Sequence, residues 1–364
     1  MKKKSVAILT FHRAVNYGAV LQAYGLQTAL NNLGFKADIL DYRNDDVENY
    51  YYKTFKGKNL KGAVKSIVTH KTQKERNKKF IEFSKQYLNY SEKTYNRKTV
   101  IHSKDLYDYF IVGSDQMWNL PAIHYDKTYF LDFVTDNSKK KSYAISMGKI
   151  SDCEKDYGDY YPLINDFDSI SLRENAGKNY LEKNVSKDIT IDLDPSFLLE
   201  SSQWREISKS PQIDNYALIY SVNLTANVIE TGRKYAKENG LKLVLVTLRN
   251  KEIPLQDNEF NLSCCSPTEF LGLVDNAKCV VTNSFHGTAF SVVLGTNFWT
   301  VKNSAQGLDN SRMETLLNTF NLSDRHISAP DEATDILTDF SKAEEILSKL
   351  RNKSISNLID SFNK

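Results

Sequence analysis

The sequence predicts an α/β protein with two Rossmann-like domains that face a cleft. Short apolar runs alternate with segments of helical period, which is typical of βαβ units and a mainly parallel sheet. This alternation occurs twice, once near the N-terminus and again from residue 216. The chain has 364 residues, 41% of them apolar, and single domains usually stop growing near about 250–300 residues. The length therefore also favours two domains.

The first series of elements begins with the apolar run Val6–Leu9, a predicted strand. A helix follows over residues 19–33, where Gly34 supplies a stop signal, and residues 37–40 form the next strand. Further strands are predicted where apolar runs end in small polar residues, at residues 109–112, 142–146 and 170–172.

The second series has the same order of signals. Its predicted strands are Tyr216–Ser221, residues 241–247 and Cys279–Thr282. Its predicted helices lie near residues 227–239, 267–276 and 287–294. Both halves of the chain therefore have the alternating order of a Rossmann-like domain.

The boundary between the two series is expected near residues 184–195. We predict an N-terminal domain at residues 1–190, a C-terminal domain at residues 191–340 and a helical tail at residues 341–364. Residues near 45–103 are rich in lysine and lack a strand signal, which favours a basic helical insertion. Its basic face is either a solvated surface or a patch for anionic lipid head groups or a diphosphate carrier.

The composition excludes several classes of function. Lys and Arg total 48 against 45 Asp and Glu, and the net charge of +3 gives no basis for nucleic-acid binding. No window approaches the roughly 20 apolar residues that span a bilayer, and the first apolar run ends too early for a signal peptide. The four cysteines lack zinc spacing, and no ligand cluster indicates a metal or cofactor. We expect a cytoplasmic protein whose membrane contact, if any, is peripheral and at the inner face.

Polar residues at the carboxyl ends of the predicted strands are the first candidates for a site, because ligands of open α/β sheets bind there. The loop after the first strand contains His12 and Asn16 and leads into a helix whose free N–H groups favour an anion. Asp115 follows the strand at residues 109–112 and is a candidate general base or sugar ligand, and Trp118 is a candidate for stacking on a sugar ring. The structural alternatives are an ordinary loop, a turn or cap, and a core tryptophan.

Arg173 follows the strand at residues 170–172 and has the two-pronged geometry that pairs with carboxylate or phosphate. The alternative is a surface pair with Glu174. Downstream, Arg312 opens another helix and is a second arginine for the same cleft.

Ser284, His286 and Gly287 lie where the strand Cys279–Thr282 passes into a helix. A helix N-terminus favours phosphate, and histidine delivers protons near neutral pH, so His286 is the leading catalytic candidate. The alternative for a single histidine is a structural role.

Five segments, in this order, resemble the polysaccharide pyruvyl transferase family. They are Asn16–Tyr24, Val112–Asn119, Ser171–Glu174, Asp194–Leu199 and Ser284–Gly287. The similarity extends over roughly residues 6–317. Members of this family look like GT-B glycosyltransferases, so the resemblance implies two Rossmann-like domains in a GT-B-like arrangement.

The resemblance implies a transferase that moves pyruvate from phosphoenolpyruvate, its co-substrate, onto a sugar as a ketal and releases phosphate. The acceptor would belong to a surface polysaccharide, such as a capsule or exopolysaccharide, or to its lipid-linked precursor. Arg173 and His286 match positions associated with phosphoenolpyruvate binding and catalysis. The phosphate is expected near Gly287 and the carboxylate against Arg173 or Arg312.

Many family members carry arginine two residues before the histidine, where this chain has Ser284. Arg312 or Arg173 is expected to take over that role. Two alternatives stay open: a GT-B-type glycosyltransferase that uses a nucleotide sugar, and a non-catalytic glycan-binding or anion-binding protein of the same fold. The sequence leaves the acceptor sugar, the pair of hydroxyls that is joined, the oligomeric state and any need for a metal undetermined.

Overall fold

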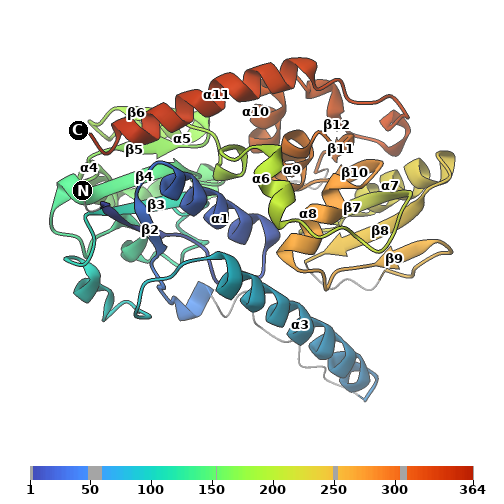
Figure 1. Ribbon diagram of the computed structural model, residues 1–364, viewed down its shortest axis with the longest axis horizontal. Coiled ribbons are helices and arrows are strands. Elements are labelled where there is room, and N and C mark those ends of the chain that lie inside the picture. The colour runs from blue at the N-terminus through green and yellow to red at the C-terminus, as the bar shows by residue number, and fades with distance from the viewer. Residues whose placement is uncertain (1–2, 48–59, 153, 249–252, 304–309, 364) are drawn as a thin grey trace.

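The computed structural model describes residues 3–47, 60–152, 154–248, 253–303 and 310–363. Residues 48–59 of the predicted basic insertion and Cys153 lie outside the described residues. The described chain forms two six-stranded parallel sheets with helices packed against them (Figure 1). This arrangement confirms the predicted α/β class with two Rossmann-like domains.

The first sheet has the strand order β2-β1-β3-β4-β5-β6. Its strands are β1 (Ser5–Leu9), β2 (Lys36–Ile39), β3 (Tyr109–Asp115), β4 (Lys140–Ile145), β5 (Ile170–Leu172) and β6 (Ile189–Ile191). Strands β1 and β3 are parallel neighbours, with Ile8 opposite Ile111. Nearly every position of these two strands is buried, as expected for parallel strands covered on both faces.

The helices of the N-terminal half are α1 (Tyr17–Asn32), α3 (Leu60–Tyr87), α4 (Tyr161–Asn165), α5 (Asn175–Leu181) and α6 (Ser201–Ile207). Asn16 caps α1, because its Oδ1 accepts a hydrogen bond from the backbone N of Gly18 at 3.0 Å. Helix α3 lies within the predicted insertion and projects from the body of the molecule in Figure 1. Near its C-terminal end, Phe80 packs on Tyr17 and joins α3 to the core.

The second sheet has the strand order β12-β11-β10-β7-β8-β9. Its strands are β7 (Tyr216–Ser221), β8 (Lys242–Thr247), β9 (Glu259–Asn261), β10 (Cys279–Thr282), β11 (Phe298–Val301) and β12 (His326–Ile327). Its helices are α7 (Ala226–Glu238), α8 (Pro267–Asp275), α9 (Phe285–Leu294) and α10 (Ser311–Thr319). Helix α11 (Ser341–Asp360) follows at the C-terminus. Of all helices in the described ranges, none is both long and apolar enough to cross a membrane.

Short 3-10 helices occupy several connections between these elements. They are Val100–Ser103, Lys127–Phe130, Asn137–Lys139, Ile150–Asp152, Glu154–Asp159, Pro195–Phe197, Ser323–Arg325 and Pro330–Glu332. The turn Pro195–Phe197 lies in the passage from the first sheet to the second and contacts both α1 and α9.

Each sheet has a switch point, where the direction of strand addition reverses. In the first sheet it lies between β1 and β3, and in the second between β7 and β10. Ligands of doubly wound sheets bind beyond the carboxyl ends of the strands at such points. The fold therefore marks two positions, one in each domain, at which to look for a site.

The two domains are tied together by packing and by the end of the chain. One hydrophobic cluster includes β1 and α1 residues together with residues of β7, α8 and α9. Helix α11 runs back along the N-terminal domain toward β5 and β6 (Figure 1). There Ser354 accepts a hydrogen bond from the backbone N of Leu193, and Asn357 donates one to Asp192. The C-terminal helix thus belongs to the N-terminal domain by its contacts.

Candidate active site

Gly18 and His286 meet where the two domains touch, in a region that we call the seam. Gly18 lies in the first turn of α1 beside the switch point of the first sheet, and His286 lies in the first turn of α9 beside that of the second. A methyl group on Gly18 would lie 2.7 Å from Cε1 of His286 and closer still to Nδ1. Because real carbon contacts are longer than this, only glycine at residue 18 lets the imidazole lie here. The two loops that contain these residues, both candidates from the sequence, therefore lie in direct contact.

Asp194 connects the buried charges of the seam. Its Oδ2 accepts hydrogen bonds from Arg173 Nη1 at 2.7 Å and from Ser114 Oγ at 3.1 Å. Its Oδ1 accepts from the backbone N and the Oγ of Ser196, and it lies 3.8 Å from Nε2 of His286. Burial by itself would raise the pKa of Asp194, but the neighbouring His286 and Arg173 hold that pKa well below its usual range. Asp194 is therefore a permanent negative charge beside Nε2 of His286.

Arg173 is buried at the end of β5 and faces three carboxylates. Beside its bond to Asp194, its Nε is 3.6 Å from Glu174 and its Nη2 is 3.9 Å from Asp115. The guanidinium also lies 4.3 Å above the ring of Phe285, which comes from the other domain. Burial lowers the pKa of Arg173, and the three carboxylates more than reverse this. The arginine thus bridges the seam, with its charge largely balanced by the protein.

Asp115 is presented by an unusual backbone conformation. It ends β3 with a φ of +70°, a region that non-glycine residues rarely adopt. Its carbonyl oxygen accepts hydrogen bonds from the backbone N of Met117 and of Ser146, which hold the turn in place. Its side chain remains partly exposed, unlike that of Asp194. Strained positions that the surrounding fold enforces occur most often at functional sites.

Four buried polar atoms around the seam lack a hydrogen-bond partner. They are Arg173 Nε, Glu174 Oε2, Tyr220 Oη and His286 Nε2. Folded proteins pair nearly all buried polar atoms, because an unpaired one loses its hydration without compensation. The four atoms come from both domains, and they offer donors and an acceptor to a polar ligand. This concentration of unpaired groups is the strongest structural mark of a site in the described part of the chain.

The start of α9 supplies backbone groups to the same region. Ser284 caps this helix, and its side-chain oxygen accepts from the backbone N of Gly287 at 3.5 Å. A methyl group on Gly287 would lie 2.8 Å from Cδ1 of Tyr220, so glycine is required there as well. The helix dipole and the free N–H groups of the first turn favour an anion at this position.

Arg312 lies beside this region in a small polar pocket of about 60 Å³. The pocket is lined by Asn283, Phe285, Val301, Asn303, Asn310, Arg312, Met313 and His326. Phe285 belongs both to this pocket and to the stack on Arg173, so the pocket adjoins the seam. The structure therefore brings Arg173, Ser284, His286, Gly287 and Asp115 together and puts Arg312 next to them.

His12 and Asn16 lie in the predicted loop but have structural roles. His12 is buried, with Nε2 bonded to Asp41 at 3.1 Å and Nδ1 bonded to the carbonyl oxygen of Thr10 at 3.0 Å. Both ring nitrogens are thus already paired within the protein. The side chain of Asn16 caps α1. The interpretation of these two residues as substrate ligands is corrected accordingly.

Trp118 is also corrected, because its ring is fully buried. Phe130 stacks on it at 5.4 Å, Phe167 packs against it edge-on, and its Nε1 donates to the carbonyl oxygen of Tyr129. A ring that is covered in this way cannot stack on a sugar. The core alternative is the correct one.

Three residues of the seam were not predicted from the sequence as site residues. Asp194 appears within one of the family-like segments but received no role, and Glu174 was considered only as a partner for Arg173. Tyr220 lies inside a predicted strand, where an aromatic residue gives no signal of function. An Asp-Pro pair at the end of a parallel strand was the one available sign for Asp194, since carboxyl ends carry the ligands.

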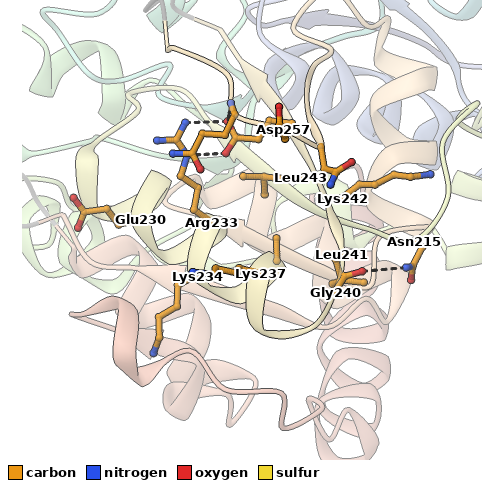
Figure 2. Close-up of a pocket in the computed structure, with 14 residues that line it drawn as sticks. Asn215, Glu230, Arg233, Lys234, Lys237, Gly240, Leu241, Lys242, Leu243 and Asp257 are labelled. Carbon is orange, nitrogen blue, oxygen red and sulfur yellow. Dashed lines mark hydrogen bonds and ion pairs between the residues drawn. The ribbon is translucent and has the colours of Figure 1, made fainter.

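A larger pocket than the one beside Arg312 lies elsewhere. With a volume of about 850 Å³, it is bounded by α7 and by residues at the amino ends of β7 and β8 (Figure 2). Two of its cations are already paired, since Arg233 bonds Glu259 and Lys242 pairs with Asp214. It is at the opposite end of the sheet from the switch point, so we do not assign the site to it.

Comparison with known proteins identifies the family. A profile of the family described as polysaccharide pyruvyl transferase matches residues 16–304, most of the chain. The protein belongs to this family. The matched region contains Gly18, Asp115, Arg173, Asp194 and His286 of the seam, whereas Arg312 lies beyond it. A search of curated protein sequences finds no match.

Two solved structures have a similar fold. A UDP-GlcNAc 2-epimerase from Methanocaldococcus jannaschii has a TM-score of 0.51 at 11% identity, and the match covers 96% of this chain and 93% of that chain. An alpha-glucosyltransferase in complex with UDP and a 13-mer DNA has a TM-score of 0.50 at 10% identity, covering 99% and 95%. At such low identity the similarity concerns the fold alone, which is the GT-B arrangement of two Rossmann-like domains.

Proposed function

We propose that this protein transfers pyruvate from phosphoenolpyruvate onto a sugar of a surface polysaccharide, free or lipid-linked, as a ketal. Membership of the polysaccharide pyruvyl transferase family supports the class of reaction. The observation that carries the proposal is the seam itself, where His286 Nε2 is buried, unpaired and 3.8 Å from a permanent carboxylate, Asp194. Phosphoenolpyruvate is a co-substrate here, and the proposed chemistry uses no metal or other cofactor.

The charges of the seam suggest how the two substrates are arranged. Asp115, Glu174 and Asp194 gather around the single cation Arg173, so this side carries an excess of negative charge. Such a cluster suits the hydroxyl groups of a sugar better than an anion. The phosphate group of phosphoenolpyruvate is better placed at the start of α9. The carboxylate group of the same molecule would then lie toward Arg312 and accept one hydrogen bond from Arg173 Nε.

The proposed reaction begins with a proton from His286. Protonation of the methylene carbon of phosphoenolpyruvate gives an oxocarbenium-like centre, and one sugar hydroxyl attacks it while Asp115 accepts the hydroxyl proton. A second hydroxyl then displaces phosphate and gives its proton to His286, while Asp115 passes its proton to the departing phosphate. Two carbon–oxygen bonds to the sugar form, the carbon–oxygen bond to phosphate breaks, and both residues return to their starting states. Asp194 stabilises the imidazolium before transfer, and general acid catalysis of this kind contributes about 10²–10⁴-fold.

The test is acceptor-dependent release of phosphate from phosphoenolpyruvate. We would compare wild type and His286→Ala over a panel of acceptors that contain galactose, mannose or N-acetylmannosamine. The expected result is release by wild type with at least one acceptor and a loss of about 10²-fold or more in the variant. Near-normal turnover by His286→Ala at saturating donor would refute the role of this histidine.

Two alternatives predict different outcomes in binding experiments. A glycosyltransferase that uses a nucleotide sugar would bind UDP, but not phosphoenolpyruvate, in calorimetry. A non-catalytic member of the fold would bind a glycan or anion without any release of phosphate. Both measurements use the wild-type chain and the same acceptor panel.

A further inference from the structure

The hydroxyl group of Tyr220 is buried without a partner at the switch point of the second sheet. Tyr220 is the penultimate residue of β7, and its side chain is fully buried. Its ring packs against Phe270 at 4.6 Å and against Tyr17 of the other domain at 5.8 Å, and these two rings stack on each other. Its carbonyl oxygen accepts a hydrogen bond from Thr282 Oγ1 at 2.7 Å, which ties β7 to β10. The position of the hydroxyl is therefore well fixed.

The surroundings of this tyrosine belong to the start of α9. A methyl group on Gly287 would lie 2.8 Å from its Cδ1, so the ring packs directly on the first turn of the helix. Burial raises the pKa of Tyr220 more than its neighbour Ser284 lowers it. The hydroxyl consequently keeps its proton at physiological pH and can donate it to an acceptor.

Other buried tyrosine hydroxyls of this protein have a hydrogen-bond partner, including one on the same strand. Tyr216 is also fully buried, and its Oη donates to the carbonyl oxygen of Leu273 at 2.8 Å. Tyr17, in the seam, likewise donates to the carbonyl oxygen of Cys265 at 2.9 Å. Tyr220 differs from both, because its hydroxyl group has no hydrogen-bond partner and lies beside a helix N-terminus.

We propose that the Tyr220 hydroxyl, Ser284 and the first turn of α9 form an oxyanion subsite that binds the phosphate or carboxylate group of the donor. The proposal rests on the proposed function and assigns a binding residue to it. It also gives a physical reason why Ser284 suffices where many members of the family have an arginine. The neutral Tyr220 donor and the backbone N–H groups of the helix start then bind the anion in place of that arginine.

The experiment compares Tyr220→Phe with the matched control Tyr216→Phe. Each change removes one buried hydroxyl from the same strand. Binding of inorganic phosphate, pyruvate and phosphoenolpyruvate is measured separately by calorimetry, and thermal unfolding is measured without ligand. Phosphate and pyruvate distinguish which end of the donor the subsite holds.

The two variants should show opposite effects. Tyr220→Phe should bind phosphoenolpyruvate and either phosphate or pyruvate about 10- to 100-fold more weakly, with a melting temperature equal to or above that of wild type. Tyr216→Phe should melt at a lower temperature and bind the same anions with unchanged affinity. Equal anion affinity in wild type and Tyr220→Phe would overturn the subsite, as would the absence of anion binding by wild type. If phosphate binds through Tyr220 while no acceptor supports release from phosphoenolpyruvate, the subsite stands and the proposed donor does not.

Discussion

Replacing Gly18 with alanine tests whether the position of His286 controls turnover. The change adds one methyl group at the start of α1, on the opposite domain from the histidine. That methyl group would lie 2.7 Å from Cε1 of His286 and closer to Nδ1. Comfortable carbon–carbon contacts are about 3.5–4.0 Å, so the imidazole has to retreat by about 1 Å or the domains have to separate.

The expected loss follows from that displacement. A misplacement of about 1 Å in a catalytic group costs on the order of 10²-fold in rate. The net loss of stability should be at most about 2.5 kcal/mol, because overpacking costs about 1–3 kcal/mol and alanine recovers about 0.5–1 kcal/mol when it replaces glycine within a helix. We therefore expect Gly18→Ala to fold and to lose about 10²-fold in kcat.

The assay is the initial rate of phosphate release at saturating phosphoenolpyruvate and acceptor, combined with thermal unfolding. Gly232→Ala is the matched control, because it also adds a methyl group to a helical glycine and creates a short contact, 2.5 Å from Cδ1 of Ile219. Gly232 lies within α7, on the buried face of this helix in the C-terminal domain. It should change stability by a similar amount while kcat stays at the wild-type value.

A normal kcat in Gly18→Ala would refute the reasoning, because it would mean that the imidazole can move without consequence. An equal loss in both variants would also refute it, since the loss would then reflect overpacking in general. Only a selective loss in Gly18→Ala agrees with a positional role for His286.

Two further predictions concern stability. Burial raises the pKa of Asp194, but His286 and Arg173 hold it well below its usual range, and His12 and Thr94 do the same for Asp41. The stability that these two carboxylates contribute is therefore present above about pH 5 and is lost as the pH falls below about 4. Urea unfolding between pH 3 and 7 should show this decline, and a flat profile would contradict it. Trp118→Ala should lower the free energy of unfolding by about 3–5 kcal/mol, without the selective rise in KM for the acceptor that a sugar-stacking role would require.

Much of the fold could be predicted because the strands carry an unambiguous signal. Tyr216–Ser221 and Cys279–Thr282 have the same bounds in the structure as in the prediction, since both are short apolar runs that the fold buries completely. The strand Glu259–Asn261 was not predicted, because it is a short, largely polar edge strand with no apolar run. Helix α9 begins at Phe285, two residues earlier than predicted, because Ser284 caps it.

Only the site residues that follow a predicted strand could be recognised as candidates from the sequence. Arg173 directly follows β5 and His286 lies in the first turn of the helix after β10, so parallel topology brings each to the carboxyl edge of its own sheet. The pairing of both with Asp194 depends on how the two domains pack, which local sequence does not encode. His12 and Trp118 show the converse error, because a histidine beside a buried carboxylate and a tryptophan in an aromatic core have the same sequence signals as functional residues.

The return of α11 to the N-terminal domain limits how the protein can open. The chain passes between the domains twice, after β6 and again before α11, so the C-terminal domain is an insertion held by two connections. Two connections permit rotation about the line that joins them more readily than any other relative motion. A substrate that enters the seam would thus part Gly18 from His286 by a hinge movement. The last helix of the chain, although remote from the chemistry, would set the axis of that movement.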